Sequence, residues 1–300
     1  MSRYHITNMN IVLTDGKDKY QSGDYITGKV ELILKGNLLI SVINIQLYCL
    51  ADVKWTELPG LKSDGHCFHV QRRYLEFNYQ LPDEFRDRYF DDGINEIPFM
   101  FRLPDSGLPS TFKSPYGSIN YFIEAYIGEP IIDESLRTKL AIAVESPFKD
   151  NLYLSVDGEA EKELGIVNLA SGVIRMYAFI GHKGHVPGQT VELICQIDNK
   201  STARVTPRAT LYRTEIYMTG EKHKTVETIL TDPFQGTEVE PGETIDSVIN
   251  IPIPDDLPMS LKCPNITIKY FIHCTLDIPH TIDLHLNLPI ILTNNQMLDG

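Results

Sequence analysis

Ile119-Asn120-Tyr121-Phe122-Ile123 in the first half of the chain and Ile268-Lys269-Tyr270-Phe271-Ile272 in the second half are two versions of one stretch. Both place apolar residues at every second position, which is the period of a β-strand with one face against a core. Tyr270 follows Tyr121 by 149 residues. The spacing indicates that the chain contains two copies of one β structure.

The repeat extends upstream of each stretch. Residues 97–105 with Leu108-Pro109-Ser110 have their counterpart in residues 249–255 with Leu257-Pro258-Met259. Near the start of each copy, a turn signal (Ser22-Gly23-Asp24 or Pro187-Gly188-Gln189) precedes an alternating segment. Because proline cannot donate to a β-ladder, each proline-punctuated segment is expected to end one strand and lead into the next.

Alternation of period two continues through most of the chain, for example at the odd positions from Ile43 to Val53, and helical periodicity is nearly absent. The pattern predicts an all-β fold with two tandem antiparallel β-sandwich domains of immunoglobulin-like architecture. We expect the domains at residues 1–147 and 166–300. The charged residues 148–165, with Glu159, Glu161, Lys162 and Glu163, are interpreted as an interdomain connector with room for a helical turn.

Composition limits the classes of function. The net charge of -13 makes nucleic acid and a polybasic membrane surface poor candidates as partners. The five cysteines are odd in number and include no C-x-x-C pair, which argues against a disulfide framework and a zinc finger. No apolar run approaches the ~20 residues that span a bilayer, and the first residues do not read as a signal peptide. We therefore expect a soluble intracellular protein.

The sequence has only weak matches to nucleotide-binding, metal-binding and catalytic motifs. Residues 23–29 fit G-x-x-x-x-G-K, but Val30 follows where a phosphate loop needs Ser or Thr, so a turn into a strand is expected. His66, Cys67 and His69 lack a fourth ligand at suitable spacing for a metal. G-x-S-x-G and H-E-x-x-H are absent from the sequence. We predict no catalytic, cofactor-binding or metal-binding residue, and therefore no enzyme.

Partner binding is the class that we favour, with a structural self-assembling protein as an alternative. Five residues are candidates for partner binding: Trp55, Arg72, Arg73, Lys222 and Lys224. Trp55 is the single tryptophan, so it is a candidate anchor for a partner, with a core position as the alternative. The basic pairs are candidate contacts for an anionic partner, with solvated strand ends as the alternative.

Stretches in both halves of the chain resemble the arrestin-domain (α-arrestin) family. In the first half they include Tyr20-Gln21-Ser22-Gly23-Asp24-Tyr25-Ile26-Thr27-Gly28-Lys29-Val30, Leu108-Pro109-Ser110-Thr111-Phe112 and Tyr116-Gly117-Ser118-Ile119-Asn120-Tyr121. In the second half they are Lys183-Gly184-His185-Val186-Pro187-Gly188 and Leu286-Asn287-Leu288-Pro289-Ile290. The resemblance covers nearly the whole chain. It implies two arrestin-like sandwiches and a non-catalytic adaptor in protein trafficking or signalling, without a cofactor. The partners that it implies are tails of membrane receptors or transporters, a HECT-type ubiquitin ligase or a sorting complex.

Departures from the family pattern limit these implications. The sequence has no P-P-x-Y motif, through which many members recruit HECT ligases, and residues 5–13 have no lysine for reading phosphate. An alternative within the same fold is a retromer-type sorting subunit that binds a helical-solenoid partner. Either reading implies a cytoplasmic protein with peripheral association at the plasma membrane or endosomes.

Overall fold

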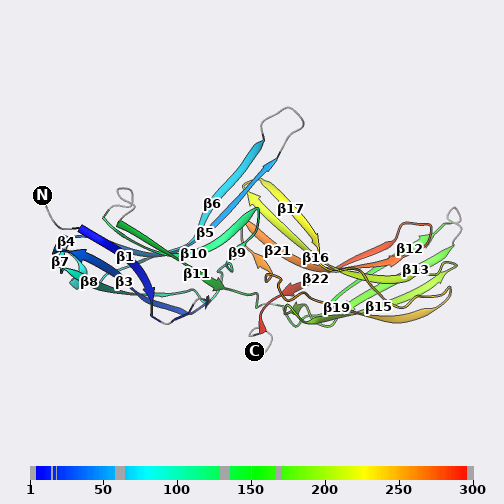
Figure 1. Cartoon of the computed structure of the whole chain (residues 1–300). Helices are drawn as coiled ribbons and strands as arrows, with labels where there is room; N and C mark the ends of the chain where they lie inside the picture. The colour runs from blue at the N-terminus through cyan, green and yellow to red at the C-terminus, as the bar shows by residue number, and fades with distance from the viewer. Residues whose placement is uncertain are drawn as a thin grey trace. The chain divides into compact units, whose positions relative to one another are not determined.

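The computed structural model describes residues 5–14, 16–17, 19–57, 65–128, 136–149, 151–165 and 171–295. Its regular structure is almost entirely β-strand, and the chain divides into two units, Met1–Ser146 and Pro147–Gly300 (Figure 1). No helix in the described ranges is long and apolar enough to cross a membrane. The prediction of an all-β fold with tandem β-sandwiches is confirmed.

The first unit pairs a smaller and a larger sheet. The smaller sheet has the order β1-β3-β8 (His5–Leu13, Tyr25–Lys35, Gly93–Arg102). The larger sheet has the order β2-β11-β10-β5-β6 (Lys19–Gln21, Arg137–Glu145, Gly117–Ile127, Ile43–Glu57, His66–Tyr79), and β9 (Phe112–Lys113) pairs with β10. A short ladder joins β4 (Leu38–Ile40) to β7 (Arg88–Phe90), and a 3-10 turn, η1, covers Asp83–Phe85.

The second unit repeats this plan. Its smaller sheet has the order β12-β13-β15-β19 (Val156–Leu164, Gly172–Ile180, Thr190–Ser201, Thr244–Pro252). Its larger sheet has the order β14-β22-β21-β16-β17 (Gly184–His185, Leu284–Leu292, Ile266–Asp277, Thr206–Thr219, Lys222–Ile229). β18 (Phe234–Gln235) pairs with β16, and β20 (Leu261–Lys262) pairs with β21. Neighbouring strands are antiparallel except for β2 with β11 and β14 with β22, the equivalent parallel pair of each unit.

The alternating residues that were read from the sequence form the two cores. On β10 the buried set is Ile119, Tyr121, Ile123 and Ala125, and on β21 it is Ile268, Tyr270, Ile272 and Cys274. Because neighbouring residues of a strand point to opposite faces, the residues between them lie on the outer faces of the larger sheets. In the first unit, Phe122 lies on this outer face, between the core residues Tyr121 and Ile123.

The interpretation of residues 157–164 as a connector with a helical turn is wrong. Residues Val156–Leu164 form β12, which pairs with β13 along its whole length in the second unit. Only Val156 and Leu164 of this strand are buried, and the inner positions between them are Gly158, Ala160 and Lys162. The apolar signal of a half-buried strand was therefore too weak to outweigh the run of glutamates on its outer face.

The repeated turn and the repeated proline segment contact each other in both units. The Gly23 N–H donates to the Pro104 carbonyl, and the Gly188 N–H donates to the Ile253 carbonyl, both at 3.0 Å. Both glycines have a positive φ, 88° at Gly23 and 86° at Gly188, which an L side chain rarely adopts. Gly23–Lys29 is accordingly a turn that enters strand β3, as predicted in place of a phosphate loop.

Gly23→Ala and Gly188→Ala are each expected to lower the free energy of unfolding by about 1–3 kcal/mol, because an alanine is strained at positive φ. The cost should be larger at Gly188, where a Cβ would lie 2.3 Å from Asp255 Oδ1, than at Gly23, where the distance to Asp105 Oδ1 would be 2.8 Å. Urea unfolding measures the change. Gly181→Ala is the control, since a Cβ there meets nothing within 4 Å. Equal stability of all three variants would contradict the argument.

Candidate functional site

Trp55 lies inside the first unit. It is 3% exposed on β5, its ring stacks on Phe68 with centroids 5.2 Å apart, and its Nε1 donates to Glu57 Oε1 at 3.0 Å. A ring in this position stabilises the pairing of β5 with β6. Trp55 therefore occupies a core position, which was the alternative to a partner anchor. The structure therefore does not offer the Trp55 ring to a partner.

Arg72 and Arg73 are adjacent in sequence but lie on opposite faces of the larger sheet. Arg72 pairs with Ala51, which belongs to the core-facing set, whereas Arg73 pairs with Leu50 on the outer side. The register shifts next to them, because Cys49 pairs with Leu75 and leaves Tyr74 as an extra residue. Because neighbouring residues of a strand point to opposite faces, only Arg73 of the two points toward the outer face.

Lys222 and Lys224 lie on β17, at the edge of the larger sheet of the second unit. They pair with Thr219 and Tyr217, so they follow the face of Tyr217, whose ring is buried. The structure places them in the second unit, whereas Arg72 and Arg73 belong to the first.

Arg73 joins three residues that the sequence analysis did not identify. Tyr48 on β5 and Phe122 on β10 are cross-strand partners with ring centroids 5.5 Å apart. Lys139 on β11 holds its Nζ 3.6 Å from the Phe122 centroid, and the Arg73 guanidinium lies 4.4 Å from the Tyr48 centroid. We call Tyr48, Phe122, Arg73 and Lys139 the aromatic–cation face. Its two charges come from strands on either side of the aromatic pair, so the rings fix where both cations lie.

Beside this face lies a buried carboxylate, Glu124, which is 5% exposed. Gln46 Nε2 donates to its Oε2 at 2.5 Å, and Arg137 Nε lies 3.4 Å from its Oε1. Both oxygens of Glu124 therefore have partners of their own. Lys139, although it pairs with Glu124 in the ladder, has no carboxylate partner among the described residues. Arg73 is partly neutralised by Glu76 at 3.2 Å.

The second unit carries an equivalent aromatic pair with different neighbours. Tyr212 on β16 and Phe271 on β21 stack with centroids 5.4 Å apart, at the positions that Tyr48 and Phe122 occupy in the first unit. The rings beside them are imidazoles, with His273 at 5.5 Å from Tyr212 and His285 at 5.2 Å from His273. The two units have thus kept the aromatic pair and changed the charge around it.

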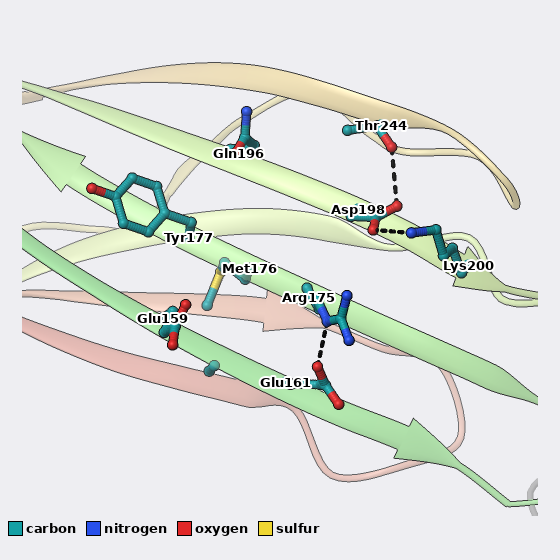
Figure 2. Close-up of a pocket in the computed structure, with 10 residues that line it drawn as sticks. Glu159, Glu161, Arg175, Met176, Tyr177, Gln196, Asp198, Lys200 and Thr244 are labelled. Carbon is teal, nitrogen blue, oxygen red and sulfur yellow. Dashed lines mark hydrogen bonds and ion pairs between the residues drawn. The ribbon is translucent and has the colours of Figure 1, made fainter.

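A trough of about 790 Å³ lies on the outer face of the smaller sheet of the second unit. Figure 2 shows its lining, in which Arg175 of β13 forms an ion pair with Glu161 of β12, and Lys200 and Thr244 both hold Asp198 of β15. The hydrogen bond from Lys200 Nζ, 2.7 Å long, holds the pKa of Asp198 below its usual range. The centre of the trough is therefore internally neutralised, whereas other carboxylates of β12 continue along its edge.

One protein-family model matches each of the two units. The model of the arrestin (or S-antigen) N-terminal domain matches residues 9–151, and the model of the arrestin (or S-antigen) C-terminal domain matches residues 170–297. Each match covers most of one unit, and β12 lies between the two matches.

Relatives in several animals match over nearly the full chain. Human arrestin domain-containing protein 4 is 25% identical over 96% of this chain and 71% of its own length. Arrestin domain-containing protein 17 of Caenorhabditis elegans is 25% identical over 98% of this chain and 72% of its own length. Human thioredoxin-interacting protein is 20% identical over 98% of this chain and 76% of its own length. The repeated sandwich, the two domain matches and these relatives show that the chain belongs to the arrestin-domain (α-arrestin) family.

Proposed function

We propose that this protein is a non-catalytic adaptor of the α-arrestin type that binds an acidic cytosolic segment of a membrane receptor or transporter on its aromatic–cation face. The bound cargo would then be passed to sorting or ubiquitination machinery in the cytoplasm, at the plasma membrane or at endosomes. Family membership supports the adaptor role. The face itself supports the choice of an acidic ligand.

The observation that carries the proposal is Lys139. Its ammonium is exposed, held over the Phe122 ring at 3.6 Å, and has no carboxylate partner among the described residues. A cation that is already positioned loses little conformational entropy when it meets an anion. Phe122 is half-buried and adds ring surface for the apolar side chains of the same segment, whereas Tyr48 is buried and holds Arg73 in place. In a chain of net charge -13, such a local positive site favours one orientation of an anionic partner.

Lys139→Glu is expected to weaken binding of a fluorescent peptide with alternating Glu and Leu residues by about tenfold, equivalent to ~1.4 kcal/mol. Fluorescence anisotropy in 50 mM salt measures the dissociation constant. Arg73→Glu should give a smaller loss, because Glu76 already neutralises part of the Arg73 charge.

Lys113→Glu is the matched control, because it makes the same charge change at an exposed position of β9 in the same unit. Its dissociation constant should stay within about twofold of the wild-type value, since long-range charge effects are screened by salt. If Lys113→Glu weakened binding as much as Lys139→Glu, the effect would be one of net charge and the aromatic–cation face would not be the binding site.

A further inference from the structure

On the outer face of the smaller sheet of the second unit, directly paired residues of neighbouring strands form rows of side chains across the sheet. One row is apolar: Phe179 of β13 pairs with Ile194 of β15, and Ile194 pairs with Val248 of β19. Directly paired residues share a face, so these three side chains lie together, and Val248 is 52% exposed. The next row adds Tyr177, which is 40% exposed and lines the trough.

A column of carboxylates follows the edge of the same face. Asp157, Glu159, Glu161 and Glu163 are alternate residues of β12, they are all exposed, and each pairs with an outward-facing residue of β13. Glu161 is neutralised by Arg175. The other three carboxylates form no ion pair with any residue in the described part of the chain. The face therefore combines exposed apolar surface with fixed, uncompensated negative charge.

We infer that this face is a second docking surface, and that its partner is an extended protein segment with Lys or Arg at alternate positions and with aliphatic residues at one end. Charge complementarity selects the basic side chains, which would lie against β12. The aliphatic residues would cover Phe179, Ile194 and Val248. This inference is independent of the proposed function, because it concerns the other unit and a ligand of opposite charge.

The spacing of the carboxylates specifies the form of the segment. Alternate residues of a strand lie about 6.7 Å apart, so the carboxylates of β12 repeat at that interval over a length of about 20 Å. Alternate residues of an extended peptide repeat at the same interval. A peptide with four alternating lysines presents all four on one face and can therefore oppose Asp157, Glu159 and Glu163 together, whereas four lysines in one block place only two on that face.

Fluorescence anisotropy of the full chain with two labelled peptides tests the inference. One peptide alternates Lys with Val and ends in two Leu residues, and the other has the same composition with its lysines in one block. We expect the alternating peptide to bind at least fivefold more tightly. Glu159→Lys combined with Glu163→Lys should weaken its binding at least tenfold, and Val248→Asp should weaken it severalfold.

The control is Glu227→Lys on β17, in the larger sheet of the same unit. It changes the charge by the same amount as each of the two substitutions on β12. It should leave binding within about twofold of the wild-type value. Equal binding of both peptides, or an equal loss in Glu227→Lys and in the β12 variant, would overturn the inference in favour of general electrostatic attraction. Lys139→Glu should bind the basic peptide as tightly as the wild type does. A failure of this second docking surface can therefore be distinguished from a failure of the proposed cargo site.

Discussion

Replacing Tyr121 or Tyr270 by alanine is expected to lower the free energy of unfolding by about 4 kcal/mol in either case. Tyr121 is fully buried and its hydroxyl donates to the Pro109 carbonyl at 2.6 Å. Tyr270 is equally buried and its hydroxyl donates to the Pro258 carbonyl, also at 2.6 Å. Burial raises the pKa of Tyr270, so its hydroxyl remains protonated as a donor. Alanine would leave a cavity and an unpaired carbonyl together.

The phenylalanine variants separate these two contributions. Tyr121→Phe and Tyr270→Phe keep the ring and lose the hydroxyl with its hydrogen bonding, so each should cost about 1–3 kcal/mol. Tyr89→Phe is the control, because Tyr89 is an exposed residue of β7, and it should change stability by less than about 0.5 kcal/mol. Urea unfolding followed by circular dichroism measures all five variants. A large cost at Tyr121 with no cost at Tyr270 would contradict the claim that the two units are built alike.

Acidification is expected to destabilise the second unit through His185. Its side chain is 2% exposed, its Nε2 has no hydrogen-bond partner among the described residues, and the ring of His182 lies 4.5 Å away. Burial, with a smaller contribution from the charge of His182, lowers the pKa of His185 from 6.5 to about 4. Between these two values the unfolded chain binds a proton that the folded chain does not bind, so stability falls as the pH falls.

The size of this effect follows from the shift. The loss is about 1.4 kcal/mol per pH unit within the window, which gives about 2 kcal/mol between pH 7.5 and pH 5 and roughly 3 kcal/mol by pH 4. Urea unfolding of the wild type and of His185→Asn at pH 7.5 and pH 5 isolates the loss of stability that is due to His185, because the variant lacks the titrating group. The wild type should lose about 2 kcal/mol more than His185→Asn. His223→Asn, at an exposed position of β17, should follow the wild type, and equal losses in all three proteins would refute the role of His185.

The larger part of the fold could be predicted because short stretches of sequence specify its strands and turns. The alternation around Tyr121 and Tyr270, the turn glycines and the proline segments each specify a strand or its end, and their repetition specifies two units. Contacts between these motifs, such as those of Tyr121 with Pro109 and of Gly23 with Pro104, depend on the sandwich as a whole. β12 was missed because Gly158, Ala160 and Lys162 give its inner face little apolar signal between the two buried ends, and because its outer face is acidic.

The candidate site could be predicted only in part, because it is assembled from four strands. Lys139 reaches Tyr48 and Phe122 from strand β11, and nothing in its local sequence distinguishes it from any other exposed lysine. Arg73 was identified only as half of a basic pair, which the alternation of the strand divides between two faces. Trp55 was considered for its rarity, and rarity does not reveal burial.

Affinity capture from detergent-solubilised membranes tests whether this arrestin-family chain is a cargo adaptor. Tagged wild type, Lys139→Glu and Lys113→Glu would be compared by quantitative mass spectrometry of the captured proteins. Integral membrane receptors or transporters should be enriched with the wild type and with Lys113→Glu, and reduced about tenfold with Lys139→Glu. Capture of a stoichiometric helical-solenoid subunit by all three proteins, without such cargo, would contradict the account and assign the chain to a retromer-type sorting coat.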